Sequence, residues 1–96
     1  SIPNSSFLKD LLENISKQSI LIDRIQIDGK MSIFRIFLSD GAEIVIPETR
    51  NPAQIAASLQ IIISRFRIEG KFISKIDYQF DKPTVIFKSG KVITSQ

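Results

Sequence analysis

Two Asp-Gly pairs constrain the fold of this 96-residue chain more than any other feature of its sequence. Asp28-Gly29 and Asp40-Gly41 each follow a run rich in apolar and β-branched residues, and a third such run ends at Pro47. Asp-Gly is favoured in two-residue hairpin turns, because those turns require positive φ, which glycine adopts readily. The sequence therefore predicts three consecutive antiparallel strands, over residues 20–27, 31–38 and 42–46.

The strand predicted over 31–38 has large apolar groups on both faces. Its alternate residues fall into two sets, one of Phe34, Ile36 and Leu38 and the other of Ile33, Arg35 and Phe37. We expect one face to meet helices. The other face is either covered by the first helix or left partly exposed for a partner.

Two segments show the spacing of amphipathic helices. The first, over about residues 5–18, follows N-cap candidates and places apolar groups on one face, namely Phe7, Leu8, Leu11, Leu12 and Ile15. The second, over about residues 52–68, begins with Asn51 as N-cap and Pro52, and it ends near Gly70. A partner helix or a membrane could use the first apolar stripe, but packing on the chain's own sheet is favoured.

The closing segment, residues 73–90, predicts two short strands. Ile76, Tyr78 and Phe80 alternate with polar residues, and Pro83 interrupts the pattern before residues 84–88 resume it. Proline cannot donate a ladder hydrogen bond, so it belongs at the start of a strand or at a sheet edge. We therefore place the second strand, residues 84–88, at or near a sheet edge.

Together these elements predict a single domain over residues 1–96. Its class is α+β: a mostly antiparallel sheet of five to six strands with two helices packed on one face, in the order α-β-β-β-α-β-β. Residues 92–93 form either a short last strand or a loose tail. The composition, 43% hydrophobic and 24% charged, is that of an ordinary globular domain. Because the chain opens at Ser1 rather than at methionine, we expect a domain excised from a longer protein.

The residue types limit the chemistry available to the chain. It lacks cysteine and histidine, so it has no thiolate nucleophile, imidazole base or soft metal ligand. Asp77 and Asp81 would share a face if one regular strand ran through both, but Asp81 lies in a turn sequence. We therefore expect no catalytic, cofactor-binding or metal-binding residue and no enzyme. A small hydrolase that uses Asp77 is the remaining catalytic alternative.

Positive charge is concentrated in the last third of the chain. Residues 1–64 hold six basic and seven acidic groups, whereas residues 65–96 hold seven basic and three acidic groups. Such a basic segment could meet an acidic partner, an anionic membrane surface or nucleic acid, or it could be a solvated face. A small domain that binds nucleic acid or an anionic surface is therefore the alternative function. We expect no nucleic-acid partner, because the aromatic residues near Lys82 and Lys88 alternate as core residues do.

The string Ile73-Ser-Lys-Ile-Asp-Tyr-Gln-Phe-Asp81 resembles the I-S-x-I-D-L-R-F/Y-D signature near the end of bacterial cell-division proteins of the FtsQ/DivIB family. The hairpin Leu38-Ser-Asp-Gly-Ala-Glu-Ile-Val-Ile46 is similar to the family's L-x-D/N-G-x-x-I/V-x-L hairpin, and the helix from Pro52 follows in the family's order. The resemblance covers residues 7–93. It implies that the chain is the extracytoplasmic β domain of a single-pass membrane protein at the division septum, without its membrane helix and POTRA domain.

The resemblance also implies a function. Members of the family are non-enzymatic scaffolds of the divisome that bind the FtsB/DivIC and FtsL proteins, and FtsB adds a β-strand to the last strand of the domain. Carried over by position, the partner-binding surface comprises Gln79, Phe80, Lys82, Pro83, Thr84, Val85, Ile86, Phe87 and Lys88. Gln79 stands where the signature has an arginine that can pair with a partner carboxylate, so that ion pair is lost. Lys82 or Lys88 could replace it.

Strand addition at residues 84–88 requires their backbone N–H groups to be unpaired in the free domain. Under this hypothesis, Phe87→Asp or Val85→Pro would abolish partner binding while the fold survives. A homodimer through the same edge strand is the alternative use of these groups.

Overall fold

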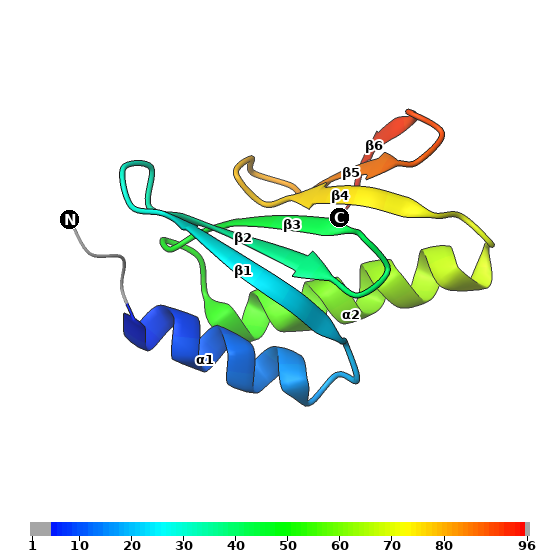
Figure 1. Ribbon diagram of the computed structural model, residues 1–96. Helices are drawn as coiled ribbons and strands as arrows, with labels where there is room; N and C mark the ends of the chain where they lie inside the picture. Colours follow the sequence, from blue (N-terminus) through cyan, green and yellow to red (C-terminus); the bar gives the residue numbers. More distant parts are fainter. Residues whose placement is uncertain (1–4, 96) are drawn as a thin grey trace.

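The computed structural model describes residues 5–95, which form two helices and a six-stranded sheet (Figure 1). In chain order the elements are α1 (Ser5–Ser16), β1 (Ile22–Asp28), β2 (Ile33–Leu38), β3 (Glu43–Pro47), α2 (Pro52–Ile68), β4 (Ile73–Asp77), β5 (Thr84–Phe87) and β6 (Val92–Thr94). The strands lie in the sheet in chain order. Neighbouring strands are antiparallel, except that β3 and β4 are parallel. The α+β class and the mostly antiparallel sheet are thus confirmed, with β6 as a sixth strand.

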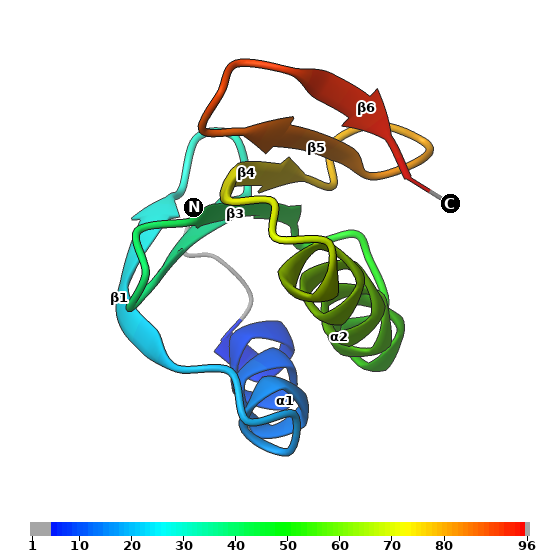
Figure 2. The same ribbon diagram turned by 90° about the vertical axis from the view of Figure 1, so that its right-hand side faces the viewer.

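Both helices cover the same face of the sheet (Figures 1 and 2). The buried side chains of α1 are Phe7, Leu11 and Ile15, and those of α2 are Ile55, Ala56, Leu59, Ile62 and Phe66. They form one core with Phe34, Ile36 and Leu38 of β2. The prediction that one face of β2 meets helices is confirmed. Neither helix covers the opposite face, which carries Ile33, Arg35 and Phe37.

The long helix α2 connects the two parallel strands. A parallel connection has to return to the starting end of the sheet, and a helix is the usual crossover. At its start, the Asn51 side chain accepts the Gln54 N–H at 3.1 Å, and Pro52 needs no N–H partner. At its end, Gly70 has a φ of +70°, and the Lys71 N–H donates to the Phe66 carbonyl at 2.9 Å. These caps confirm the predicted bounds of 52–68.

The two Asp-Gly turns differ in conformation. Gly41 has a φ of +93°, and the Asp40 carboxylate accepts the Ala42 N–H at 3.0 Å. In the β1–β2 connection the positive φ, +53°, falls on Ser32 and not on Gly29. This connection is therefore longer than the predicted two-residue turn, and β2 begins at Ile33 rather than at residue 31.

Other boundaries also differ from the prediction. The first helix ends at Ser16 instead of residue 18. Of its N-cap candidates over residues 3–6, Ser5 and Ser6 lie inside the helix, and Pro3 and Asn4 lie outside the described residues. Strand β4 ends at Asp77, so Phe80, predicted to alternate within a strand, lies in the β4–β5 connection with an exposed side chain. Within residues 5–95, no helix is both long enough and apolar enough to cross a membrane.

Candidate functional site

Strand β5 lies inside the sheet and not at its edge. On one side it pairs with β4, where Ile76 is opposite Val85, and on the other with β6, where Ile93 is opposite Val85. The prediction that residues 84–88 present unpaired backbone groups is therefore wrong. The cause is the turn after β5, in which Gly90 adopts a φ of +94° and donates its N–H to the Phe87 carbonyl at 2.8 Å. This turn folds β6 back over the edge that β5 would otherwise offer.

Strand β6 is the edge strand at this side of the sheet. The Phe87 N–H donates to the Lys91 carbonyl at 2.8 Å, and the Ser95 N–H donates to the Pro83 carbonyl at 2.7 Å. The backbone N–H and C=O groups of the odd-numbered residues 91, 93 and 95 therefore point toward β5. Those of the alternate residues, Val92 and Thr94, point away from the sheet. No residue within 5–95 pairs with these four backbone groups. They form a short stretch of sheet edge to which a further strand could pair.

The side chains of β6 divide between the two faces of the sheet. Ile93 lies opposite the fully buried Val85 and packs against the core. Val92 and Thr94 lie on the other face, opposite Ile86 and Thr84, and the Val92 side chain is 55% exposed. A strand added to β6 would therefore meet a small exposed row of Val92 and Thr94 on the face away from the helices.

A hollow of about 510 Å³ borders this edge. It is lined by Phe80, Asp81, Lys82, Thr84 and Thr94. The Phe80 side chain is 58% exposed. Three residues of the predicted surface, Phe80, Lys82 and Thr84, are thus brought together. Thr94, which no sequence pattern indicates, joins them.

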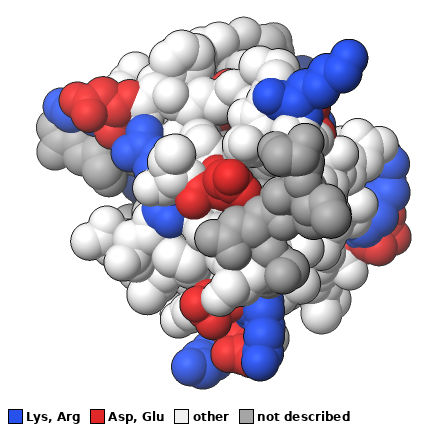
Figure 3. Space-filling model, turned by 90° about the vertical axis from the view of Figure 1, so that its left-hand side faces the viewer, with Lys and Arg blue, Asp and Glu red and all other residues white. Residues whose placement is uncertain are grey.

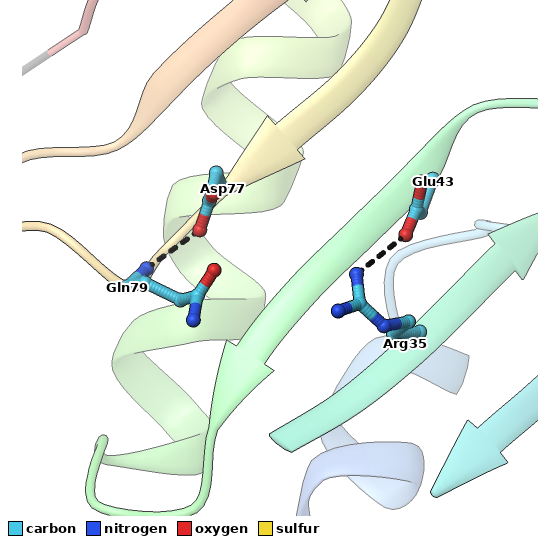
Figure 4. Close-up of polar contacts among 4 residues, drawn as sticks. All are labelled: Arg35, Glu43, Asp77 and Gln79. Atoms are coloured by element: carbon cyan, nitrogen blue, oxygen red, sulfur yellow. Dashed lines mark hydrogen bonds and ion pairs between the residues drawn. The ribbon is translucent and has the colours of Figure 1, made fainter. Parts of the chain in front are cut away.

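The other predicted residues are placed elsewhere. Val85 and Phe87 are buried in the core, and Ile86 is half-buried. Pro83 lies directly before β5, as predicted for a strand start. Lys88 lies toward the opposite end of β5, where its Nζ donates to the Asp40 carbonyl at 3.2 Å. Gln79 lies beside Asp77, whose carboxylate accepts the Gln79 backbone N–H at 2.9 Å (Figure 4).

Arg50 fixes the chain segment that carries Phe80. Its Nε donates to the Tyr78 carbonyl at 3.2 Å, and a terminal guanidinium nitrogen donates to the Phe80 carbonyl. The Tyr78 hydroxyl lies 2.8 Å from the Ser58 Oγ, and burial raises the pKa of Tyr78 to about 12. The loop before α2 and α2 itself therefore hold the turn after β4. Sequence reasoning missed Arg50, because a single arginine in a loop gives no pattern.

The sheet face away from the helices is covered by polar side chains. Arg35 and Glu43 form an ion pair at 3.0 Å, and Asp77 of β4 lies on the other side of β3 from Arg35 (Figure 4). Val45, opposite both Arg35 and Asp77 in the register, is fully buried, and Ile33 is also buried. The sequence left open whether this face of β2 is covered by the first helix or partly exposed for a partner. The first helix does not cover it, and Val45 and Ile33 on this face are nevertheless buried.

Asp77 and Asp81, the acidic pair considered for catalysis, do not lie on one regular strand. Asp77 is the last residue of β4, and Asp81 lies in the connection beyond it, so no regular strand runs through both. The Asp77 carboxylate is buried and accepts the Gln79 N–H. In the described part of the chain, no group of three or more acidic residues is placed to hold a metal ion.

A second hollow lies where α2 ends. It has a volume of about 310 Å³. Its lining combines three basic residues and one acidic residue with apolar residues: Arg67, Lys71, Lys88 and Asp40, with Ile63, Phe72 and Ile73 among the apolar ones. Phe72 is 72% exposed and the neighbouring Ile68 is 87% exposed. At the opposite end of the molecule, Figure 3 shows basic and acidic side chains in small mixed groups. Basic charge and exposed apolar groups therefore coincide at the α2 end.

Acidic groups offset part of this basic charge. Glu69 accepts from Lys71 at 3.3 Å and from Arg65 at 3.2 Å, and these two contacts lower the pKa of its carboxyl. Arg67 has no acidic partner within residues 5–95. It remains available to an external anion.

No family model, curated protein or solved structure matches this chain.

Proposed function

We propose that this chain is a non-enzymatic interaction domain of the bacterial divisome, related to the extracytoplasmic β domain of the FtsQ/DivIB proteins. Its partner is a segment of an FtsB/DivIC-type or FtsL-type protein, which adds as a strand to β6. The order of the signature, hairpin and helix motifs supports the family assignment. The observation that carries the docking site is the outward-facing backbone of Val92 and Thr94, which no residue within 5–95 pairs with, beside the Phe80 hollow.

The docking geometry follows from the edge. A partner strand pairs its own backbone with the N–H and C=O groups of Val92 and Thr94. Alternate partner side chains then point to the face of Val92 and Thr94, where one of them reaches the hollow beside Phe80. The edge is short, so the backbone bonds supply part of the affinity and the hollow supplies the rest.

Lys82 is the cation of this site. It lines the hollow together with the exposed Phe80. Gln79, at the position of the family arginine, is turned toward Asp77 instead. In the proposed complex a partner carboxylate pairs with Lys82 on the side of the hollow away from the acidic Asp81, and Phe80 is the apolar contact.

Proline substitutions at the two edge strands of the sheet test this docking site. Val92→Pro removes an N–H that faces outward and leaves the bonds between β5 and β6 in place. Ile27→Pro makes the same kind of change at the far edge of the sheet and is the matched control. With a fluorescent FtsB/DivIC-type segment, anisotropy titrations should show binding weakened at least tenfold by Val92→Pro and unchanged by Ile27→Pro. Equal affinities for both variants, with unchanged circular dichroism, would rule out docking at β6.

The α2 end supports a second candidate function, binding to an anionic membrane surface. Exposed apolar groups flanked by basic side chains are typical of protein surfaces that insert into anionic interfaces. Ile68 and Phe72 supply the apolar groups, and Arg67, Lys71 and Lys88 supply the charge. Co-sedimentation with vesicles that contain anionic lipid, at two salt concentrations, tests this function. Binding that is lost on Phe72→Ser but retained on Met31→Ser, an exposed residue at the other end, would favour it.

A further inference from the structure

Strand β1 forms the other edge of the sheet, and the bonds of β2 show which of its groups face outward. The Leu38 N–H donates to the Ala42 carbonyl at 2.8 Å, and the Ser32 carbonyl accepts the Glu48 N–H at 3.0 Å. The backbone N–H and C=O groups of the even-numbered residues of β2 therefore point toward β3, and those of the odd-numbered residues point toward β1.

The backbone of β1 is open on its outer side. Arg24, Gln26 and Asp28 lie opposite the odd-numbered residues of β2, so their N–H and C=O groups turn inward. Ile25 and Ile27 turn theirs outward, and no residue within 5–95 pairs with them. The stretch follows a register shift between Ile22 and Arg24 and contains no proline, lysine or glycine. The stretch from Arg24 to Asp28 thus lies beyond the register shift and lacks the proline and lysine that commonly block pairing at an edge strand.

We propose that β1 pairs antiparallel with β1 of a second copy of this chain, about a two-fold axis at Gln26. In this register Ile25 of one copy lies opposite Ile27 of the other, and Arg24 lies opposite Asp28. Each outward-facing isoleucine meets another outward-facing isoleucine, so each such pair exchanges two backbone hydrogen bonds. The two sheets become one continuous sheet across the axis.

The side chains are self-complementary in this register. Arg24 and Asp28 lie on the face away from the helices, and neither forms an ion pair within residues 5–95. Arg24 extends over the Phe37 ring at 4.0 Å, and one Asp28 oxygen accepts the Met31 N–H. The pairing gives each arginine a carboxylate directly across the strands, at positions where cross-strand side chains lie closest. On the helix face it covers Ile27, which is 52% exposed.

Neighbouring registers fit less well. A shift by one residue pairs an outward-facing backbone group with an inward-facing one, so the ladder is lost. A two-fold axis at Ile27 places Arg24 opposite Lys30, and an axis at Ile25 places Asp23 of the irregular region opposite Ile27. The chemistry of the strand thus selects both the occupant, a copy of itself, and the register.

This pairing does not depend on the proposed function, because β1 and β6 lie at opposite edges of the sheet. A dimer joined at β1 has a β6 edge at each outer end. It therefore presents two docking edges that face apart, which would make binding to a multivalent partner bivalent.

Charge reversal tests the pairing through complementation. Arg24→Asp places two carboxylates opposite each other at both positions, and Asp28→Arg does the same with two arginines. Each variant alone should dimerise at least tenfold more weakly than the unaltered chain in sedimentation velocity. An equimolar mixture should recover the dimer, because each arginine then faces a carboxylate of the other variant. Failure of the mixture to recover, or a monomer at all concentrations of the unaltered chain, would overturn the proposal.

A single cysteine tests the register directly. The chain has no cysteine of its own, and Gln26→Cys would place two thiols across the axis at a Cα separation of about 4.5 Å, which suits a disulfide. Under mild oxidation this variant should form a covalent dimer, whereas Lys9→Cys, on the exposed side of α1, should not. Equal yields from the two variants would contradict a two-fold axis at Gln26.

Discussion

Val85 of β5 lies opposite Ile93 of β6. Because of this pairing, the edge of the sheet is formed by residues 92–94 and not, as the sequence predicts, by residues 84–88. The strand that the family resemblance selects for partner binding is therefore a buried, doubly paired strand. Under the proposed function, the partner therefore docks on β6, the strand that covers β5. The hollow beside the edge nevertheless retains Phe80, Lys82 and Thr84 from the predicted surface.

Phe87→Ala is expected to destabilise the fold. Phe87 is buried, and its ring meets that of Phe66 edge-on at a centroid distance of 4.9 Å. Truncating such a residue costs about 3–5 kcal/mol of unfolding free energy. Urea denaturation measures this loss, with Phe72→Ala, at an exposed phenylalanine, as a control that should change stability by less than about 0.5 kcal/mol.

This prediction replaces one drawn from the sequence. Phe87→Asp and Val85→Pro were expected to remove partner binding and spare the fold. Because both residues are buried in the core, these substitutions should unfold the chain instead. A folded Phe87→Asp variant with native circular dichroism would contradict the buried position of this side chain.

Arg50→Ala is expected to loosen the turn that holds Phe80. The substitution removes the guanidinium bonds to the carbonyls of Tyr78 and Phe80, and hydrogen bonds from a charged group contribute about 1.5–3 kcal/mol each at most. Arg50→Lys keeps the charge but cannot donate in two directions from a planar group, so it should recover little. Amide exchange at residues 79–82 should accelerate in both variants. Full recovery by lysine would show that charge alone, and not the two-pronged contact, fixes the turn.

Because of Tyr78, the free energy of unfolding should decrease with increasing pH in the alkaline range. Burial raises its pKa to about 12 in the folded chain, above the ordinary value of about 10 that applies when unfolded. The folded state thus holds the proton more tightly. The resulting stabilisation is complete below pH 10 and is lost as the pH rises from about 10 to 12, by up to about 2–3 kcal/mol.

Tyrosinate absorbance measures this directly, since Tyr78 is the only tyrosine in the sequence. The folded chain should titrate near 12, and the chain in urea near 10. Tyr78→Phe should flatten the alkaline part of the stability curve. A midpoint near 10 in the folded chain would contradict the burial of this hydroxyl.

Gly90→Ala is expected to weaken β6. Gly90 adopts a φ of +94°, a conformation that costs an alanine about 1–2 kcal/mol, and no neighbouring atom lies where the new Cβ would be. The strain should fall on the β5–β6 turn and accelerate amide exchange at Ile93 and Ser95. Gly29→Ala is the matched control, because Gly29 does not adopt positive φ. Equal effects of the two substitutions would argue against strain at Gly90.

Much of the fold could be predicted because the signals are local. Asn51, Pro52 and Gly70 set the ends of α2, and Pro83 sets the start of β5. The apolar spacing of α1 and α2 gives their buried faces, as Leu11 and Leu59 illustrate. Each of these signals depends on a few neighbouring residues and on no distant contact.

The remaining features depend on tertiary contacts. A three-residue strand such as β6 is too short for periodicity to reveal, and only its pairing with β5 fixes it. The positive φ predicted at Gly29 falls on Ser32, because Asp28 accepts the Met31 N–H and the connection lengthens. Likewise the hollow joins Phe80 to Thr94, which no spacing rule connects. The family resemblance selects β5 for partner binding, but β5 is paired with β4 on one side and with β6 on the other.

Amide hydrogen exchange at Val92 and Thr94 tests the central claim most directly. In the free chain their N–H groups should exchange fast while those of Ile93, Ser95 and Phe87 exchange slowly, and a saturating FtsB/DivIC-type segment should protect Val92 and Thr94. Slow exchange at Val92 and Thr94 in the free chain, or no added protection when the segment is bound, would contradict strand addition at β6.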